Sequence, residues 1–311
     1  MELLHPQCAG LDVHQHTVVA CARVVAGSSV THDVRTFGTT TQELVALSDW
    51  LTAHGCTHVA MESTGVYWKP VWHVLEGSVA LVLANAMHIR NIPGRKSDVN
   101  DATWIADLLA HGLIRGSFVP PAPIQELRDL TRTRKQLVRE ITQHTLRIQK
   151  TLETANLKLT GTLSDILGVS GRAILQALVA GETNPERLAE LARGRIKASR
   201  ADLVAGLHGR VTAHHRFLLQ LHLAQSEALE GAVREVEARL GDALAPFRAA
   251  VDRLITRPGV SETVARVIVA EIGFEMTRFL SHGRPSHLLG RALSASRREC
   301  RQTPLHPHPP Q

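Results

Sequence analysis

The 311-residue sequence predicts an α/β domain at its N-terminal end, followed by a long helical region and a shorter helical segment. Three observations support this. Short apolar runs alternate with helical patterns up to about residue 117, three prolines interrupt FVPPAPI (118–124), and apolar residues then recur at spacings of seven and four. Strands that alternate with helices are typical of α/β domains, and heptad spacing is typical of paired helices.

Four short strands are predicted in the N-terminal region. Residues 9–25, AGLDVHQHTVVACARVV, indicate a strand, a polar turn and a second strand. Residues 57–61 and 78–84 form two further apolar runs, and the first of these ends at Glu62. Between them, STGVYWKPVWHVLEG predicts a helix with Ser63 or Thr64 as its N-cap and Gly77 as its end. GRKSDVNDATWIADLL (94–109) predicts another helix.

The region after Ile124 has the pattern of a coiled coil. Its apolar seam consists of Leu130, Leu137, Ile141, Ile148, Leu152 and Leu159. The same stretch is rich in cations: Arg128, Arg132, Arg134, Lys135, Arg139, Arg147, Lys150 and Lys158. These cations are consistent with a solvated helix face, but their excess over acids favours binding to a phosphate backbone. Helical, charged sequence resumes after Pro185 and continues to about Leu254.

RPGVSETVARVIVAEIG (257–273) predicts a tight turn at Gly259 and an apolar helix. The pattern fits the second half of a helix-hairpin-helix, whose turn offers backbone N–H groups to a phosphate. An ordinary turn between two helices fits equally well.

The composition narrows the functional classes. A net charge of +6 and a pI of about 9.5 favour an anionic partner such as nucleic acid. The four cysteines include no C-x-x-C pair, which argues against zinc sites and disulfide frameworks. No signal peptide and no membrane-spanning stretch are visible, so we expect a cytoplasmic protein without a membrane partner.

Four acidic residues of the N-terminal region suggest a metal site. Asp12 lies inside an apolar strand, where a carboxylate is costly unless it is paired, and Glu62 ends another strand. Asp98 and Asp101 are three residues apart and are expected on one helix face, although Asp98 could instead cap the helix. Carboxylate oxygens are the ligands that hard divalent cations prefer, and Arg95 and Lys96 are then expected near the same phosphate.

The GLDV strand, the MEST-G-VYW segment and the K-S-D-x-x-D-A run resemble the DEDD transposases of bacterial insertion sequences. The resemblance covers residues 9 to about 279 and includes the basic coiled coil and the PGV-SETVA segment. It implies an N-terminal domain of the ribonuclease H fold, similar to the Holliday-junction resolvase RuvC. Ser97 stands where the family usually has threonine.

The resemblance also implies a mechanism and partners. In the family, an aspartate, a glutamate and two aspartates bind two magnesium ions, which manganese can replace. By motif these residues are Asp12, Glu62, Asp98 and Asp101. The expected partners are DNA at the element ends and the target, a structured "bridge" RNA that acts as guide, and further copies of the chain in dimers and tetramers. As a bacterial protein of this kind, it is expected at the nucleoid.

The resemblance divides the chain into four parts. We expect a RuvC-like DEDD catalytic domain at 1–119 and a helical coiled-coil region at 120–250. Residues 251–280 are expected to begin the C-terminal transposase domain, with its turn similar to a helix-hairpin-helix. Residues 281–311, with five prolines and five arginines, are expected to be a disordered or frameshifted tail.

A reading-frame shift is favoured because the family's catalytic serine, in an S-A-G-K-R type motif, is not present in the chain. Shifting synonymous codons of residues 284–293 by one base yields a family-like segment containing tryptophan. The same shift in the codons of residues 298–303 yields Glu-Ser-Ala-Gly-Lys-Arg. The leading expectation is therefore an RNA-guided transposase that cannot complete recombination. Two alternatives are a stand-alone RuvC-like nuclease for branched DNA and a non-catalytic nucleic-acid-binding remnant.

Overall fold

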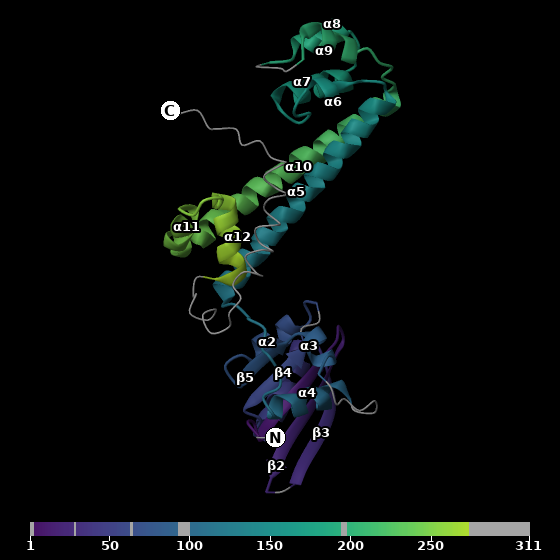
Figure 1. The fold of residues 1–311 in the computed structure, drawn as a ribbon. Helices are drawn as coiled ribbons and strands as arrows, with labels where there is room; N and C mark the ends of the chain where they lie inside the picture. Colours follow the sequence, from purple (N-terminus) through teal and green to yellow (C-terminus); the bar gives the residue numbers. More distant parts are fainter. Residues whose placement is uncertain (1–2, 28, 63–64, 93–99, 194–197, 274–311) are drawn as a thin grey trace. The chain divides into compact units, whose positions relative to one another are not determined.

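The computed structural model describes residues 3–27, 29–62, 65–92, 100–193 and 198–273. The chain divides into two compact units, with the boundary between Val119 and Pro120 (Figure 1). Each unit has its own apolar clusters of buried side chains.

A mixed five-stranded sheet forms the centre of the first unit. Its strand order is β3-β2-β1-β4-β5, in which β1, β2 and β3 pair antiparallel and β4 and β5 continue the sheet in parallel with β1. The strands are β1 Gln7–Val13, β2 Thr17–Ala26, β3 Ser29–Gly38, β4 His58–Glu62 and β5 Ala80–Ala84.

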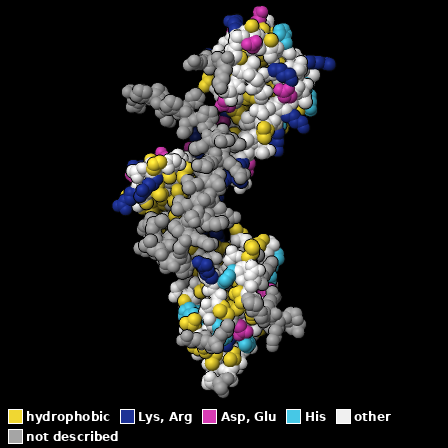
Figure 2. Space-filling view, in the orientation of Figure 1, with side chains coloured by type: hydrophobic (Ala, Val, Ile, Leu, Met, Phe, Trp, Pro, Cys, Tyr) yellow, Lys and Arg dark blue, Asp and Glu magenta, His cyan; other side chains and the backbone are white. Residues whose placement is uncertain are grey.

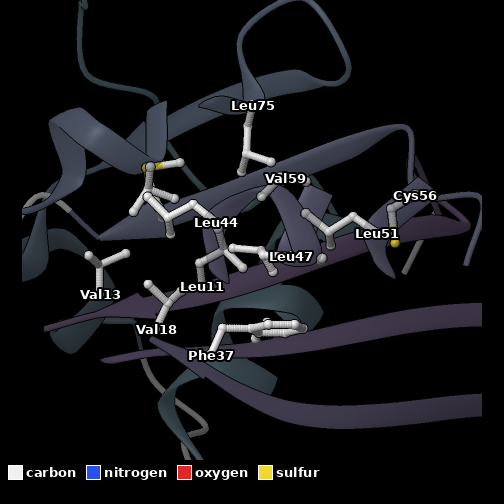
Figure 3. Close-up of a cluster of buried hydrophobic side chains, with 14 of the residues drawn as sticks. Leu11, Val13, Val18, Phe37, Leu44, Leu47, Leu51, Cys56, Val59 and Leu75 are labelled. Carbon is white, nitrogen blue, oxygen red and sulfur yellow. The ribbon is translucent and has the colours of Figure 1, made fainter. Parts of the chain in front are cut away.

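One face of this sheet packs against α1, Thr41–Ala53. Leu11 and Val13 of β1 lie in a buried cluster with Phe37 and with the three buried leucines of α1, Leu44, Leu47 and Leu51 (Figure 3). The helix begins where Thr40 accepts a hydrogen bond from the backbone N–H of Glu43, a typical N-cap. Its leucines recur at spacings of three and four, so one stripe of the helix covers the sheet.

The opposite face of the sheet is covered by α4, Asp101–Ala110. Its side chains Ile105, Leu108 and Leu109 are buried in a second cluster with Cys8 of β1 and Ala60 of β4. This arrangement of a mixed sheet between helices confirms the expected α/β, ribonuclease H-like fold of the N-terminal part.

The predicted strands are confirmed as β1, β2, β4 and β5, but the start of one helix is wrong. We expected the helix after Glu62 to be capped by Ser63 or Thr64, which lie outside the described residues. Instead α2 is Trp68–Leu75 with Tyr67 as its N-cap. Gly65 has a φ of 55°, and this left-handed backbone belongs to a turn rather than to a helix.

The second unit is helical in its described part, and two long helices, α5 and α10, pack against each other along it (Figure 1). They run antiparallel, because Arg134 of α5 contacts Glu237 of α10 while His144 contacts His222. The helices are α5 Ala122–Thr154, α6 Leu159–Thr162, α7 Val169–Ala180, α8 Pro185–Glu190, α9 Arg200–Gly206, α10 Ala213–Leu244, α11 Arg248–Ile255 and α12 Glu262–Ile272.

The predicted seam lies mostly on α5, whose partner is α10 of the same chain. Ile148 and Leu152 are buried, and Leu130, Leu137 and Ile141 are half-buried. Leu159 was wrongly placed on this helix. The chain leaves α5 after Thr154 and turns at Asn156, which has a φ of 59°, so Leu159 is buried from α6 instead.

The two ends of the α5–α10 pair are covered by different helices. At one end α6–α9, which we call the tip, bury Ile148 and Leu152 together with Leu219 and Leu223. At the other end α11 and α12 cover Leu127 and Leu244. None of the helices in the described ranges is both long enough and apolar enough to span a lipid bilayer.

Candidate active site

Asp12 and Glu62 are neighbours on adjacent parallel strands. Leu11 of β1 pairs with Met61 of β4, and each acid is the next residue along its strand. Neighbouring strands are about 4.8 Å apart, so the two carboxylates leave the sheet side by side. Both point to the face that α4 covers, because Asp12 shares its side with Gly10, and Glu62 shares its side with Ala60.

Gly10 sets how closely α4 approaches this face. A Cβ atom at Gly10 would lie 2.2 Å from the carbonyl oxygen of Ala102 and 2.4 Å from the backbone nitrogen of Ala106. The first turns of α4 therefore rest directly on β1, two residues before Asp12. Because Asp101 is the first residue of α4, its position is fixed near the strand ends that carry the other two acids.

The start of α4 differs from the expectation. We expected Asp98 and Asp101 to share one helix face, or Asp98 to cap the helix. The N-cap is instead Asn100, whose side chain accepts a hydrogen bond from the backbone N–H of Ala102 at 2.9 Å. Asp98 precedes this cap and lies outside the described residues, as do Arg95 and Lys96.

Histidine 14 contacts the acidic site, although the sequence analysis did not select it. Its Nε2 atom lies 3.1 Å from Oδ2 of Asp12, whose side chain is 17% exposed. His14 follows β1 directly, in the turn to β2. The sequence does place a polar residue two positions after the strand carboxylate. Because the polar HQHT stretch was already explained as a turn, no functional role was assigned to His14.

Three of the four expected metal ligands are thus described, and they lie on one face of the sheet. Within the ranges that the structure describes, no three His, Cys, Asp or Glu side chains form a group that could hold a metal ion. The expected set depends on Asp98, so the four-residue site stays a prediction.

A buried ion pair fixes α4 against β2. Nε of Arg23 lies 2.9 Å from Oδ1 of Asp107, and the same oxygen is 3.0 Å from Nε2 of His32. The Arg23 side chain is only 6% exposed. This network could not be predicted from the sequence, because its members come from β2, β3 and α4 and meet only in the folded unit.

The cations selected on α5 fall into two groups. Three of them form ion pairs with acids of other helices. Arg132 donates to both carboxylate oxygens of Glu271 at 3.0 and 2.9 Å, Arg128 also contacts Glu271, and Arg134 donates to Glu237 at 2.9 Å. These arginines stabilise the contacts of α5 with α12 and α10. Burial of Arg128 lowers its pKa, with Glu271 acting in the opposite direction.

Four other cations of α5 have no acidic partner among the described residues: Lys135, Arg139, Arg147 and Lys150. Helical geometry places Lys135, Arg139 and Lys150 within about 60° of one another around the axis. On the face in Figure 2, lysines and arginines are spread over the tip and the α11 region, with acidic side chains among them. Lys135, Arg139 and Lys150 of α5 are therefore the candidate nucleic-acid contact, a smaller surface than the net charge of the whole chain suggested.

Gly259 lies in the turn between α11 and α12, with a φ of 81°. Ser261 caps α12 by accepting a hydrogen bond from the backbone N–H of Val264. The tight turn and the helix expected within residues 257–273 are therefore present as local structure.

The first unit thus combines a ribonuclease H-like sheet with acids near the ends of β1 and β4 and at the start of α4. Residues 9–157 match the family model DEDD_Tnp_IS110, described as a transposase. The chain therefore carries the N-terminal domain of an IS110-family DEDD transposase, which covers a little under half of its residues. No curated protein sequence matches the chain.

The match to this transposase family implies cleavage and transfer of DNA strands. It also implies DNA as a partner and a divalent metal ion as cofactor. The matched residues include most of β1 and all of β4, α4 and α5, so they contain every residue proposed for the acidic site.

Proposed function

We propose that Asp12, Glu62, Asp98 and Asp101 together bind the divalent ions with which this transposase cleaves and transfers DNA, and that a structured RNA guides it to its target. The observation that carries the acidic site is the pairing of β1 with β4, which sets Asp12 beside Glu62 beneath α4.

The donor set fits magnesium or manganese. The described residues of the proposed set offer carboxylate oxygens, and hard divalent cations prefer oxygen ligands. When bound, such ions would supply positive charge that stabilises the transition state of phosphodiester cleavage. The protein's own contribution is to orient the ligands: the sheet sets the spacing of Asp12 and Glu62, and His14 holds one oxygen of Asp12.

A metal-binding experiment tests the site. We expect Mn²⁺ to raise the melting temperature of the full chain, because an ion that binds only the folded state stabilises it. Asp12→Asn should remove most of that rise. Asp49→Asn is the matched control, since Asp49 is exposed on α1, on the opposite face of the sheet. An equal rise in the wild type and in Asp12→Asn would reject the assignment.

We place the nucleic-acid contact on Lys135, Arg139, Arg147 and Lys150, with a further contact at the Gly259 turn. The support is electrostatic: these four cations have no acidic partner in the described part of the chain, whereas Arg128, Arg132 and Arg134 stabilise helix contacts. Arg95 and Lys96 are proposed to contact the same phosphates as the acidic site.

Charge reversal separates the two groups of cations. Arg139→Glu and Lys150→Glu should weaken binding to a labelled hairpin RNA and to branched DNA across sequences. Each substitution should also reduce, by about one, the slope of the logarithm of the affinity against the logarithm of the salt concentration. Arg132→Glu is the contrast, because it should lower the stability of the α5–α12 contact through repulsion by Glu271. Binding that does not depend on salt would contradict the assignment.

We further propose that the chain cannot complete recombination, because the family's serine motif is not present in its reading frame. The gene sequence after the codon for Phe279 tests the frameshift, since a family-like segment must appear one base away. Magnesium-dependent nicking of branched DNA without RNA would favour the stand-alone nuclease. Binding without nicking would favour the non-catalytic remnant.

A further inference from the structure

Two histidines meet across the long helix pair of the second unit. His144 of α5 and His222 of α10 place their Nδ1 atoms 3.3 Å apart, with ring centroids separated by 5.3 Å and ring planes at 60°. Both residues directly precede a position that faces the partner helix: Thr145 is half-buried, and Leu223 is 6% exposed.

We propose that His144 and His222 form a binding site for Zn²⁺, which would clamp α5 to α10. The separation of the two nitrogens carries the argument. Histidine nitrogens bind zinc at 2.0–2.1 Å, and two such ligands in a tetrahedral site lie about 3.3–3.4 Å apart. The observed 3.3 Å therefore matches one edge of the coordination tetrahedron.

The site is preorganised by the packing beneath it. Ile148, one turn after His144, is fully buried. Leu223 and Ser226 lie next to His222 on the buried side of α10, and Ser226 donates to the carbonyl oxygen of His222 at 2.9 Å. Helices held in this way fix both imidazoles without a metal, so binding requires little ordering of the side chains.

Burial lowers the pKa of His222, and the charges of His144 and Arg147 lower it further. This favours, for His222, the neutral form that a metal ligand requires. No hydrogen bond to Nε2 of either ring is found in the described residues, and both rings are partly exposed. Water can therefore complete the coordination shell.

This site differs in chemistry from the acidic site of the first unit. Imidazole nitrogen suits zinc, nickel and copper, whereas carboxylate oxygen suits magnesium and manganese. The inference therefore does not depend on the proposed function, and either can fail alone. The positive charge of Arg147 near the histidines limits the expected affinity, as does the number of protein ligands, which is two among the described residues.

Thermal unfolding of the full chain with Zn²⁺ tests the proposal. At about 100 times the dissociation constant, the melting temperature should rise by roughly 5–10 °C. His144→Gln and His222→Gln should each abolish this rise. His208→Gln is the matched control, because His208 is exposed elsewhere in the same unit. Cobalt provides a second readout: the wild type and the control should show the visible spectrum of a tetrahedral Co²⁺ complex with nitrogen ligands.

The outcomes are distinct. An equal rise in His144→Gln and the wild type would overturn the proposal. The lack of any Zn²⁺ effect would also overturn it and would leave an ordinary hydrogen bond between the rings. The Mn²⁺ effect assigned to Asp12 should persist in His144→Gln, so loss of one metal response does not imply loss of the other.

Discussion

Among the glycines that the structure describes in the first unit, Gly10 is the one where an added Cβ would lie nearest to other backbone atoms. Its missing side chain lets the backbone of α4 rest on β1, and the atoms in the way of a Cβ are backbone atoms that cannot rotate aside. The position of Asp101 relative to Asp12 depends on that contact.

We predict that Gly10→Ala destabilises the protein by about 3 kcal/mol, at the upper end of overpacking costs. It should also weaken Mn²⁺ binding, because α4 must move away from β1. Gly116→Ala is the control: its Cβ would meet only the Val82 side chain at 3.5 Å, an ordinary contact. Urea unfolding measures the stability of both variants. Equal losses of stability in Gly10→Ala and Gly116→Ala would contradict the role given to Gly10.

The thiols of the first unit should be inert in the folded chain. Burial raises the pKa of Cys8 to about 12 and that of Cys56 to about 11, and it also raises the pKa of Cys21. Only the thiolate reacts rapidly with alkylating reagents. At pH 8 we therefore expect three fewer thiols to be labelled in the native chain than in urea, as counted by mass spectrometry. Rapid native labelling of Cys8 would show that α4 leaves the sheet.

At the scale of the element, α5 has two different surfaces. One surface packs against α10 and α12 through buried apolar residues and the ion pairs of Arg128, Arg132 and Arg134. The other surface carries Arg139 and Lys150 and an exposed leucine, Leu146. The two surfaces should respond differently to the same substitution.

Ile148→Asp should destabilise the helix pair by about 3–5 kcal/mol, because it buries a carboxylate without a partner. Leu146→Asp should change stability by less than about 0.5 kcal/mol, since Leu146 is 51% exposed. Helicity followed by circular dichroism during urea unfolding distinguishes them. Similar midpoints for the two variants would show that α5 does not pack as described.

At the scale of the whole molecule, the chain consists of two units with separate cores. We predict two transitions in calorimetry, with Gly10→Ala and Asp12→Asn moving only one of them and Ile148→Asp only the other. A single transition that shifts as a whole in every variant would instead mean that the units unfold cooperatively.

The sequence predicted what depends on local patterns. Apolar runs located β1, β2, β4 and β5, and the prolines of FVPPAPI located the start of α5. β3 was missed because it is an edge strand with eight exposed residues in succession, so it has no apolar alternation to detect. The helix α1 was not identified either.

The site was predictable only in part, because only some of its features depend on local sequence patterns. The acids could be chosen by their places at strand and helix ends, and β1, β4 and α4 bring three of these positions to one face of the sheet. The roles of Arg132 and Arg134 could not be predicted, because Glu271 and Glu237 lie more than 100 positions away along the chain. The pairing of His144 with His222 likewise depends on the register of two helices that the tip separates.

The place of the tip between α5 and α10 also has a consequence for synthesis on the ribosome. α5 emerges first, and its apolar stripe stays uncovered until the tip and then α10 have been made. Ile148 and Leu223 share the cluster beside the tip, while Leu127 and Leu244 share the cluster at the far end. Contacts between α5 and α10 beside the tip close a shorter loop, and so cost less entropy, than contacts at the far end. We therefore expect the helices to pack first beside the tip and then progressively toward α11 and α12. The arginines that meet Glu271 are then among the last side chains of α5 to find their partner.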